Sequence, residues 1–170
     1  MSVTLVQLYI KTKDNKNRYL SAWGEIMKSQ AVTSAPPERL YLTRKHRRDI
    51  VDHCRSQAPL EACGLLSGRG SQVKTVHRMT NKDKSEEHYM MEPKEQFQVF
   101  KKLRETGGAV LGIYHSHPET EAYPSEEDKR LAFYPTTVYL IVSLTGEKPV
   151  FRGFIIDEKD NVSEVPVETT

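Results

Sequence analysis

The stretch from Gly112 to Asp128, with the sequence GIYHSHPETEAYPSEED, constrains this chain more than any other. An apolar run over residues 109–114 is typical of a strand, and it leads directly into His115 and His117. Side chains two residues apart in a strand point to the same face, so both imidazoles could bind one metal ion. Pro118 ends this strand. The simpler alternative is a pair of histidines on a solvated strand face, because most His-x-His pairs bind no metal.

A second pattern follows after seven intervening residues. Ser125 and Asp128 are three positions apart, so they would share one side of the first turn of a helix. The Asp128 carboxylate would give a third ligand, and two imidazoles with one carboxylate leave a fourth tetrahedral position open for water, as in catalytic zinc sites. Ser125 is also typical of a helix N-cap, which requires no catalysis. The two interpretations are compatible, because a capping hydroxyl is held in place.

Length and composition favour one domain with its own core, since the chain has 170 residues of which 37% are hydrophobic. No stretch approaches eighteen consecutive apolar residues, and the N-terminal charges follow a short mixed segment instead of preceding an apolar one. Neither a membrane span nor a secretory signal is indicated, so we expect a cytoplasmic protein. Cys54 and Cys63 are expected to be reduced thiols in the interior, because a domain of this size needs no disulfide.

The charge distribution is uneven. The formal net charge of +2 is too small to indicate nucleic-acid binding, yet residues 1–60 carry 11 Lys and Arg against 5 Asp and Glu. The densest basic run extends from Arg44 to Arg48. We interpret this run as a solvated helix face, with a surface for an acidic partner as the alternative.

Periodicity predicts a mixture of helices and strands. Amphipathic helices are expected from Thr43 to about Gln57 and from Pro93 to about Glu105, with a short helix from Ser125 to about Phe133. Strands are expected over 40–42, 61–68, 73–79, 88–91, 109–114, 137–144, 150–157 and 162–167. This order, with hairpins at both ends, favours an α/β or α+β fold with a mixed sheet. We expect residues 1–38 to be an N-terminal extension with flexible parts and residues 39–170 to be the functional domain.

The complete pattern includes one more residue, the glutamate at position 61. Glu61, then His115-Ser-His117, seven residues that begin with Pro118, and Ser125-x-x-Asp128 together resemble the JAMM motif of the MPN+ (Mov34/MPN/PAD-1) metalloprotease family, with every element present. The flanking sequences EACGLLSG and LGIYHSHP are most similar to the compact prokaryotic branch, and the resemblance covers roughly residues 40–167. It implies a cytidine-deaminase-like MPN/JAMM fold, in which helices flank a partly barrel-like mixed sheet.

The resemblance also implies a role for each motif residue. His115, His117 and Asp128 would bind one Zn²⁺, with water as the fourth ligand. Glu61 would act as general base and then deliver the proton to the leaving amine; without the motif it would be interpreted as a surface carboxylate at a strand start. Ser125 would donate a hydrogen bond to the oxyanion of the tetrahedral intermediate.

The implied substrate is a ubiquitin-like sulfur-carrier protein with a C-terminal Gly-Gly tail, cleaved after that tail, for example to release cysteine or to trim the tail. Two alternatives stay open: a deubiquitinase-like isopeptidase that removes a protein modifier from lysine, and a non-catalytic MPN scaffold. No nucleic-acid or membrane partner is implied, and a homodimer is compatible with the sequence.

The remaining histidines have no partner at ligand spacing, and we expect surface or structural roles for them. They are His46, His53, His77 and His88. Cys63 is expected to be a small buried side chain in a strand, and Ser116 to point away from the two histidines beside it.

Overall fold

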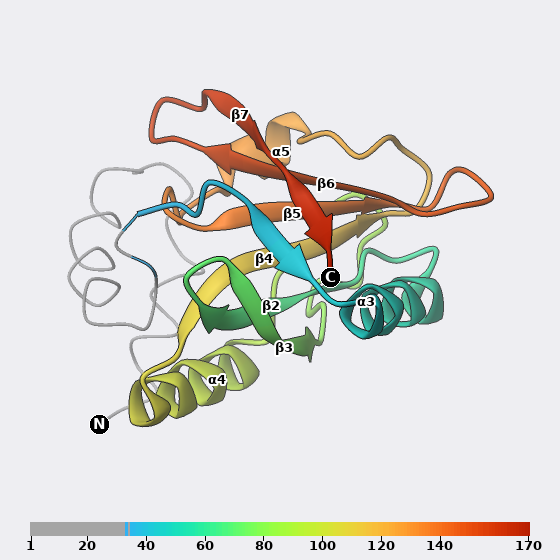
Figure 1. The fold of residues 1–170 in the computed structure, drawn as a ribbon. Coiled ribbons are helices and arrows are strands. Elements are labelled where there is room, and N and C mark those ends of the chain that lie inside the picture. The colour runs from blue at the N-terminus through green and yellow to red at the C-terminus, as the bar shows by residue number, and fades with distance from the viewer. Residues whose placement is uncertain (1–32, 34) are drawn as a thin grey trace. The chain divides into compact units, whose positions relative to one another are not determined.

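The computed structural model describes residue 33 and residues 35–170, and within them one mixed sheet of eight strands is accompanied by three helices (Figure 1). The helices are α3 (Arg44–Gln57), α4 (Pro93–Thr106) and α5 (Glu126–Arg130). The strands are β1 (Leu40–Leu42), β2 (Cys63–Arg69), β3 (Gln72–Met79), β4 (Ala109–His117), β5 (Val138–Ser143), β6 (Val150–Ile156), β7 (Val162–Val165) and β8 (Val167–Thr169). The α+β class is confirmed. The predictions for residues 1–32 lie outside the described residues.

The sheet has the strand order β7-β6-β5-β4-β2-β3-β1-β8. At its centre, β4 pairs antiparallel with β2 and parallel with β5, which makes the sheet mixed, as predicted. At one edge, β1 lies parallel to both β3 and β8. The edge strand β8 also approaches β6, where Val167 lies against Gly153, so the sheet is nearly closed. This near closure agrees with the partly barrel-like sheet that the family resemblance implies.

Both faces of the sheet are buried under a helix. The face under α3 holds one core cluster, which includes Ile50, Cys54, Leu66, Tyr114 and Val142. The face under α4 holds a second cluster, which includes Phe100, Leu103, Leu65, Ile113 and Tyr139. Alternate residues of β2 and β4 therefore point into different cores, as strand geometry requires. None of the described helices has the length and apolar character needed to span a membrane.

Local sequence signals explain where the long helices begin and end. The Thr43 side chain accepts a hydrogen bond from the His46 backbone at the start of α3. Pro93 occupies the first turn of α4, and Gly107 ends that helix with a left-handed backbone (φ 65°). Both long helices are therefore where periodicity predicted them.

The predictions and the structure differ in three places. The strand predicted over residues 88–91 is wrong, because only an isolated bridge joins Asn81 to Met91. The strand predicted over residues 162–167 is divided into β7 and β8 at Pro166. Pro166 has no N–H to donate, and its carbonyl accepts a hydrogen bond from the Leu40 amide. The helix after Ser125 ends at Arg130, earlier than predicted.

Gly64 lies where β2 passes closest to Tyr114, and it provides a test of this packing. A Cβ atom at Gly64 would lie 2.3 Å from the His77 carbonyl oxygen and 2.3 Å from Tyr114 Cε1. We therefore expect Gly64→Ala to destabilise the protein by about 1–3 kcal/mol, measured by urea denaturation. Gly146→Ala, at an exposed turn where the nearest atom is 3.7 Å away, is the matched control. Equal midpoints for the two variants would contradict this description of the core.

Candidate metal centre

The end of β4 places two imidazoles side by side in the interior. His115 and His117 point to the same face of the strand, as predicted, and both are buried. Their Nε2 atoms are 2.9 Å apart. The intervening Ser116 points the other way, where its hydroxyl accepts a hydrogen bond from the Ala62 amide at 2.8 Å. The alternative of a solvated histidine pair is therefore excluded by the structure.

The start of α5 brings the Asp128 carboxylate to the same point. Its Oδ1 lies 3.2 Å from His115 Nε2, and its Oδ2 lies 3.3 Å from His117 Nε2. Ser125 is the N-cap of α5, and its hydroxyl donates to Asp128 Oδ2 at 2.6 Å while accepting from the Asp128 amide at 3.1 Å. The capping interpretation of Ser125 is thus confirmed, and the cap also orients the carboxylate.

Glu61 reaches the site from the segment that precedes β2. Its Oε1 lies 4.0 Å from His117 Nε2, and its Oε2 is buried without a hydrogen-bond partner. Backbone contacts fix the residue, because its amide donates to the Ser85 carbonyl at 2.9 Å. The structure therefore brings together all five residues of the motif that the sequence predicted.

The spacing of these atoms fits a small divalent cation. Ligand atoms about 2.0–2.1 Å from a tetrahedral zinc ion lie about 3.3 Å from one another. The three distances that join the Nε2 atoms and the Asp128 oxygens, 2.9, 3.2 and 3.3 Å, agree with this value. Glu61, His115 and His117 also each offer an atom within 4.8 Å of the other two. Imidazole and carboxylate donors together suit zinc.

The two carboxylates of the site differ in their preference for a proton. Burial, together with the nearby charge of Asp128, raises the pKa of Glu61 to about 9. Burial alone would also raise the pKa of Asp128, but His115, His117 and Ser125 hold that pKa well below its usual range. A cation at the same point would favour the ionised form of both groups, because opposite charges attract. Asp128 is the carboxylate better suited to bind metal, and Glu61 is better suited to exchange protons.

The two imidazoles are oriented in different ways. His117 Nδ1 lies 2.8 Å from the Glu121 carbonyl oxygen, which can only accept, so Nδ1 carries the proton and Nε2 presents its lone pair to the site. His115 Nδ1 is buried and has no hydrogen-bond partner. Instead, the ring of Tyr89 stacks on the His115 ring, with centroids 4.8 Å apart and an interplanar angle of 28°. A metal-binding histidine usually donates a hydrogen bond from the ring nitrogen that does not face the metal. At His115, stacking on Tyr89 takes the place of that bond.

Asn81 connects these parts of the site, and no motif in the sequence selects it. Its Nδ2 donates to the Glu61 carbonyl at 3.0 Å and to the His88 carbonyl at 3.2 Å. Its Oδ1 accepts from the Asp83 and Met90 amides, each at 3.1 Å. One buried side chain thus binds the backbone of Glu61 and the backbone on both sides of Tyr89. The only signal in the sequence was an isolated amide at the start of a charged loop.

The other residues that we considered lie outside the site and make structural contacts. His53 Nδ1 is 2.8 Å from the Tyr114 hydroxyl, His77 Nε2 is 2.7 Å from Ser67 Oγ, and His88 Nδ1 is 2.9 Å from Ser85 Oγ. Cys54 and Cys63 are free and buried, as predicted, and burial raises the pKa of the Cys54 thiol to about 12.

Comparison with known families gives this geometry a context. The sequence profile of a family described as prokaryotic homologs of the JAB domain matches residues 43–154, a span that contains every residue of the site. This chain belongs to that family. The match confirms the resemblance to the prokaryotic branch of the JAMM/MPN+ proteins.

Three curated relatives are similar to this chain. The CysO-cysteine peptidase of Mycobacterium tuberculosis is 41% identical over 96 residues, which are 55% of this chain and 66% of that protein. A desampylase of Haloferax volcanii is 35% identical over 116 residues, or 64% of this chain and 83% of the relative. A probable TtuB-protein conjugate cleaving protease of Thermus thermophilus is 32% identical over 127 residues, or 74% and 82%. The chain spans about two thirds of the mycobacterial protein.

Solved structures support the fold. A protein from Desulfitobacterium hafniense has a TM-score of 0.70 and 43% identity, and the match covers 77% of this chain and 92% of that one. A JAB1/MPN domain protein from Archaeoglobus fulgidus has a TM-score of 0.50 and 21% identity, with 80% and 100% covered. The second likeness shows the fold alone, and it agrees with the MPN/JAMM architecture expected from the motif.

The stacking of Tyr89 on His115 can be tested through metal affinity. We expect Tyr89→Leu to weaken zinc binding about tenfold, because His115 then loses the ring that orients it. Tyr89→Phe retains the stacked ring and should bind zinc like the natural protein. Competition with a chromophoric chelator measures both affinities directly. If the leucine variant also bound zinc with unchanged affinity, Tyr89 would have no part in orienting the ligand.

Proposed function

We propose that this protein is a JAMM-type zinc peptidase that cleaves the bond after the C-terminal Gly-Gly tail of a ubiquitin-like sulfur-carrier protein. The observation that carries the proposal is the convergence of two imidazoles and the Asp128 carboxylate on one point, beside the buried carboxylate of Glu61. Family membership agrees with it.

In this proposal His115, His117 and Asp128 hold one Zn²⁺, and water is the fourth ligand. Zinc, when bound, supplies a Lewis acid that lowers the pKa of a coordinated water to about 7 and polarises a carbonyl group. The protein keeps its three ligands in place from the interior: Glu121 orients His117, Tyr89 orients His115, and Ser125 orients Asp128.

Glu61 moves the proton. Its Oε2 is buried without a hydrogen-bond partner, and a cation at the point between the imidazoles and Asp128 would keep the carboxylate ionised and able to accept a proton. Glu61 takes a proton from the attacking water and passes it to the leaving nitrogen, so the peptide bond is replaced by a carboxylate and a free amine. Ser125, at the exposed rim of the site, turns its one hydroxyl proton from Asp128 Oδ2 to the substrate oxygen that becomes negative, while its amide still donates to Asp128 Oδ2 at 2.8 Å.

The names of the relatives support a protein tail as the substrate, and they describe two kinds of bond. One relative is a peptidase for CysO-cysteine, and another is described as cleaving TtuB-protein conjugates. We therefore propose cleavage next to the tail of a small carrier protein, with cysteine as the first candidate leaving group. The alternative is an isopeptidase that releases the carrier from a lysine side chain. A non-catalytic scaffold is the third candidate, and it would not require the intact five-residue set.

We further propose that residues 39–170 form the catalytic domain, that the protein works in the cytoplasm, and that homodimers are compatible with activity. The family match over residues 43–154 supports the first point. The two free, buried thiols support the second, because disulfides are rare in reducing compartments.

Substitution of Glu61 separates metal binding from catalysis. We expect Glu61→Gln to retain zinc and to lower kcat by about 10²–10⁴, because the amide cannot accept a proton. Glu86→Gln, an exposed carboxylate in the loop after β3, is the matched control and should keep full activity. Zinc content by mass spectrometry of the purified protein and cleavage rates on one conjugate give the two readouts. Full activity in a zinc-loaded Glu61→Gln variant would refute the general-base assignment.

The leaving group can be identified with two matched substrates. The protein is incubated with a sulfur carrier extended by one cysteine and with the same carrier joined to a lysine side chain, and products are identified by mass spectrometry. We expect the cysteine-extended carrier to be cleaved faster. Cleavage of the lysine conjugate alone would establish the isopeptidase. If the protein as purified contained no zinc and cleaved neither substrate, the scaffold would be favoured.

A further inference from the structure

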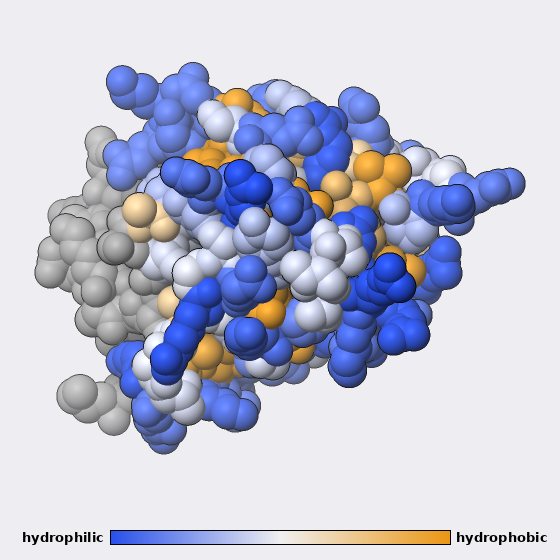
Figure 2. Space-filling model, viewed as in Figure 1, coloured by the Kyte–Doolittle hydropathy of each residue, from blue (hydrophilic) through white to orange (hydrophobic). Residues whose placement is uncertain are grey.

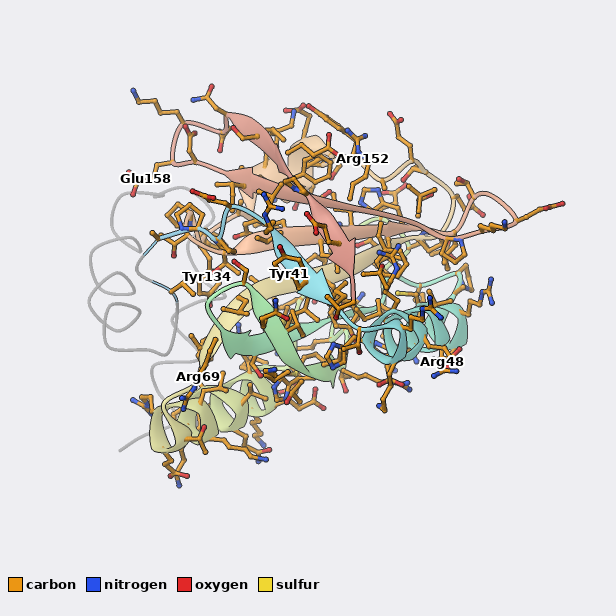
Figure 3. The ribbon with its side chains drawn as sticks, viewed as in Figure 1. Tyr41, Arg48, Arg69, Tyr134, Arg152 and Glu158 are labelled. Carbon is orange, nitrogen blue, oxygen red and sulfur yellow. The ribbon has the colours of Figure 1, made fainter. Side chains whose placement is uncertain are left out.

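The exposed face of α3 carries a concentration of arginine that the metal centre does not use. Seen from outside, α3 is covered by strongly hydrophilic residues (Figure 2), and Arg48 extends outward from it (Figure 3). A hollow between this helix and the start of β6 is lined by Arg44, Arg47, Arg48, Val51, Asp52, Arg55, Pro149 and Phe151. We call these eight residues the arginine hollow. Four guanidinium groups thus surround one hollow that contains a single acidic side chain.

Three of the four arginines of the hollow have no ion-pair partner among residues 35–170. Among the residues that the structure describes, Arg44, Arg48 and Arg55 form no ion pair, whereas the neighbouring Lys45 pairs with Asp49 at 2.6 Å. The first turn of α3 contains no acidic residue. Positive side chains near a helix N-terminus are unfavourable for the helix, because the backbone N–H groups there already carry positive charge. The stability of α3 therefore does not explain Arg44, Arg47 and Arg48, whereas Arg55 lies in the last turn, where a positive charge is favourable.

The floor of the hollow is ordered by a packed guanidinium. Arg47 Cζ lies 3.9 Å from the centre of the Phe151 ring, and burial lowers the pKa of Arg47. This contact is a cation–π interaction, and it fixes Arg47 against β6. The basic run that the sequence suggested was a solvated face is therefore partly packed and partly a concave surface. Arginine groups arranged in this way are suited to bind carboxylates in pairs of parallel hydrogen bonds.

The hollow and the metal centre lie near the same end of the sheet but on opposite faces, because Phe151 packs against the core under α3 whereas His117 points to the other face. His117 of β4 is opposite Ser143 of β5, and Ser143 is opposite Val150 of β6. Neighbouring strands are about 4.8 Å apart, so Val150 is only about 10 Å from His117 across the sheet. The turn that links β5 to β6 touches both places, because the Leu144 amide donates to the His117 carbonyl at 3.1 Å and the turn ends at Pro149.

We propose that the arginine hollow is an exosite that binds an acidic surface on the folded body of the protein substrate. This inference rests on the proposed function. A substrate tail in the metal centre brings the body of the substrate to this end of the sheet, and a body that extends past the β5–β6 turn reaches α3 on the other face. The apolar floor of Pro149 and Phe151 and the presence of Asp52 fit a protein surface better than a nucleic-acid backbone, as does the low net charge of +2.

A charge reversal tests the exosite without touching the metal centre. The full chain with Arg44→Glu and Arg48→Glu is compared with the natural protein on a folded, acidic sulfur carrier extended by cysteine and on a short peptide with the same Gly-Gly tail and bond. We expect KM for the folded carrier to rise about tenfold, with kcat unchanged and the peptide cleaved equally well. The KM of the natural protein should rise with salt, and that of the variant should not. The variant should fold, since both positions are exposed and an acidic residue at position 44 suits the first turn of the helix.

The control is Lys101→Glu with Lys102→Glu on α4, which changes the net charge equally at an exposed surface. An equal rise in KM for this control, or an effect of the α3 substitutions on the short peptide, would overturn the exosite. Binding of the carrier to zinc-loaded Glu61→Gln protein, measured by calorimetry with and without the α3 substitutions, requires no cleavage. Unchanged affinity there would also overturn the exosite, whereas the absence of cleavage by the natural protein would count against the proposed function alone.

Discussion

The position of β4 between β2 and β5 is the constraint on which the rest of the site depends. Because β4 is paired on both sides, its alternating side chains have fixed destinations: Tyr114 and Ser116 face the core under α3, and His115 and His117 face the opposite side. Two hydrogen bonds between Ser116 and Ala62 hold the end of the strand in register. A shift of one residue would exchange the two faces and remove both imidazoles from the metal centre.

The other groups of the site are added to this strand from separate parts of the chain. Asp128 arrives with the capped start of α5, and Glu61 arrives with the segment that leads into β2. The loop after β3 joins them, since Asn81 holds the Glu61 backbone and the same loop carries Tyr89 to His115. Three short segments and one central strand therefore form a site that none of them could form alone.

Short spacings in the sequence selected four of the five residues that meet at this site, whereas Glu61, far from them in the chain, was selected only through the family motif. Two patterns can be interpreted from local geometry alone. One is a strand that ends in two histidines, and the other is a capping serine three residues before an aspartate. Asn81 and Tyr89 could not be found in this way, since their importance comes from contacts with residues 20 and more positions away. The division of the last strand at Pro166 also depends on contacts between distant parts of the chain. β7 pairs with β6, whereas β8 pairs with β1 at the other edge of the sheet.

The support of Glu61 has a consequence for how this protein is handled. The proposed metal ligands are anchored by β4 and α5, whereas Glu61, the proposed base, is held through its backbone by Asn81 and Ser85 of the loop after β3. Deamidation of Asn81 would loosen the Glu61 backbone directly and would reach His115 only through Tyr89, while His117 and Asp128 keep supports outside that loop. The zinc content of a preparation therefore sets an upper bound on its competent fraction and does not measure that fraction.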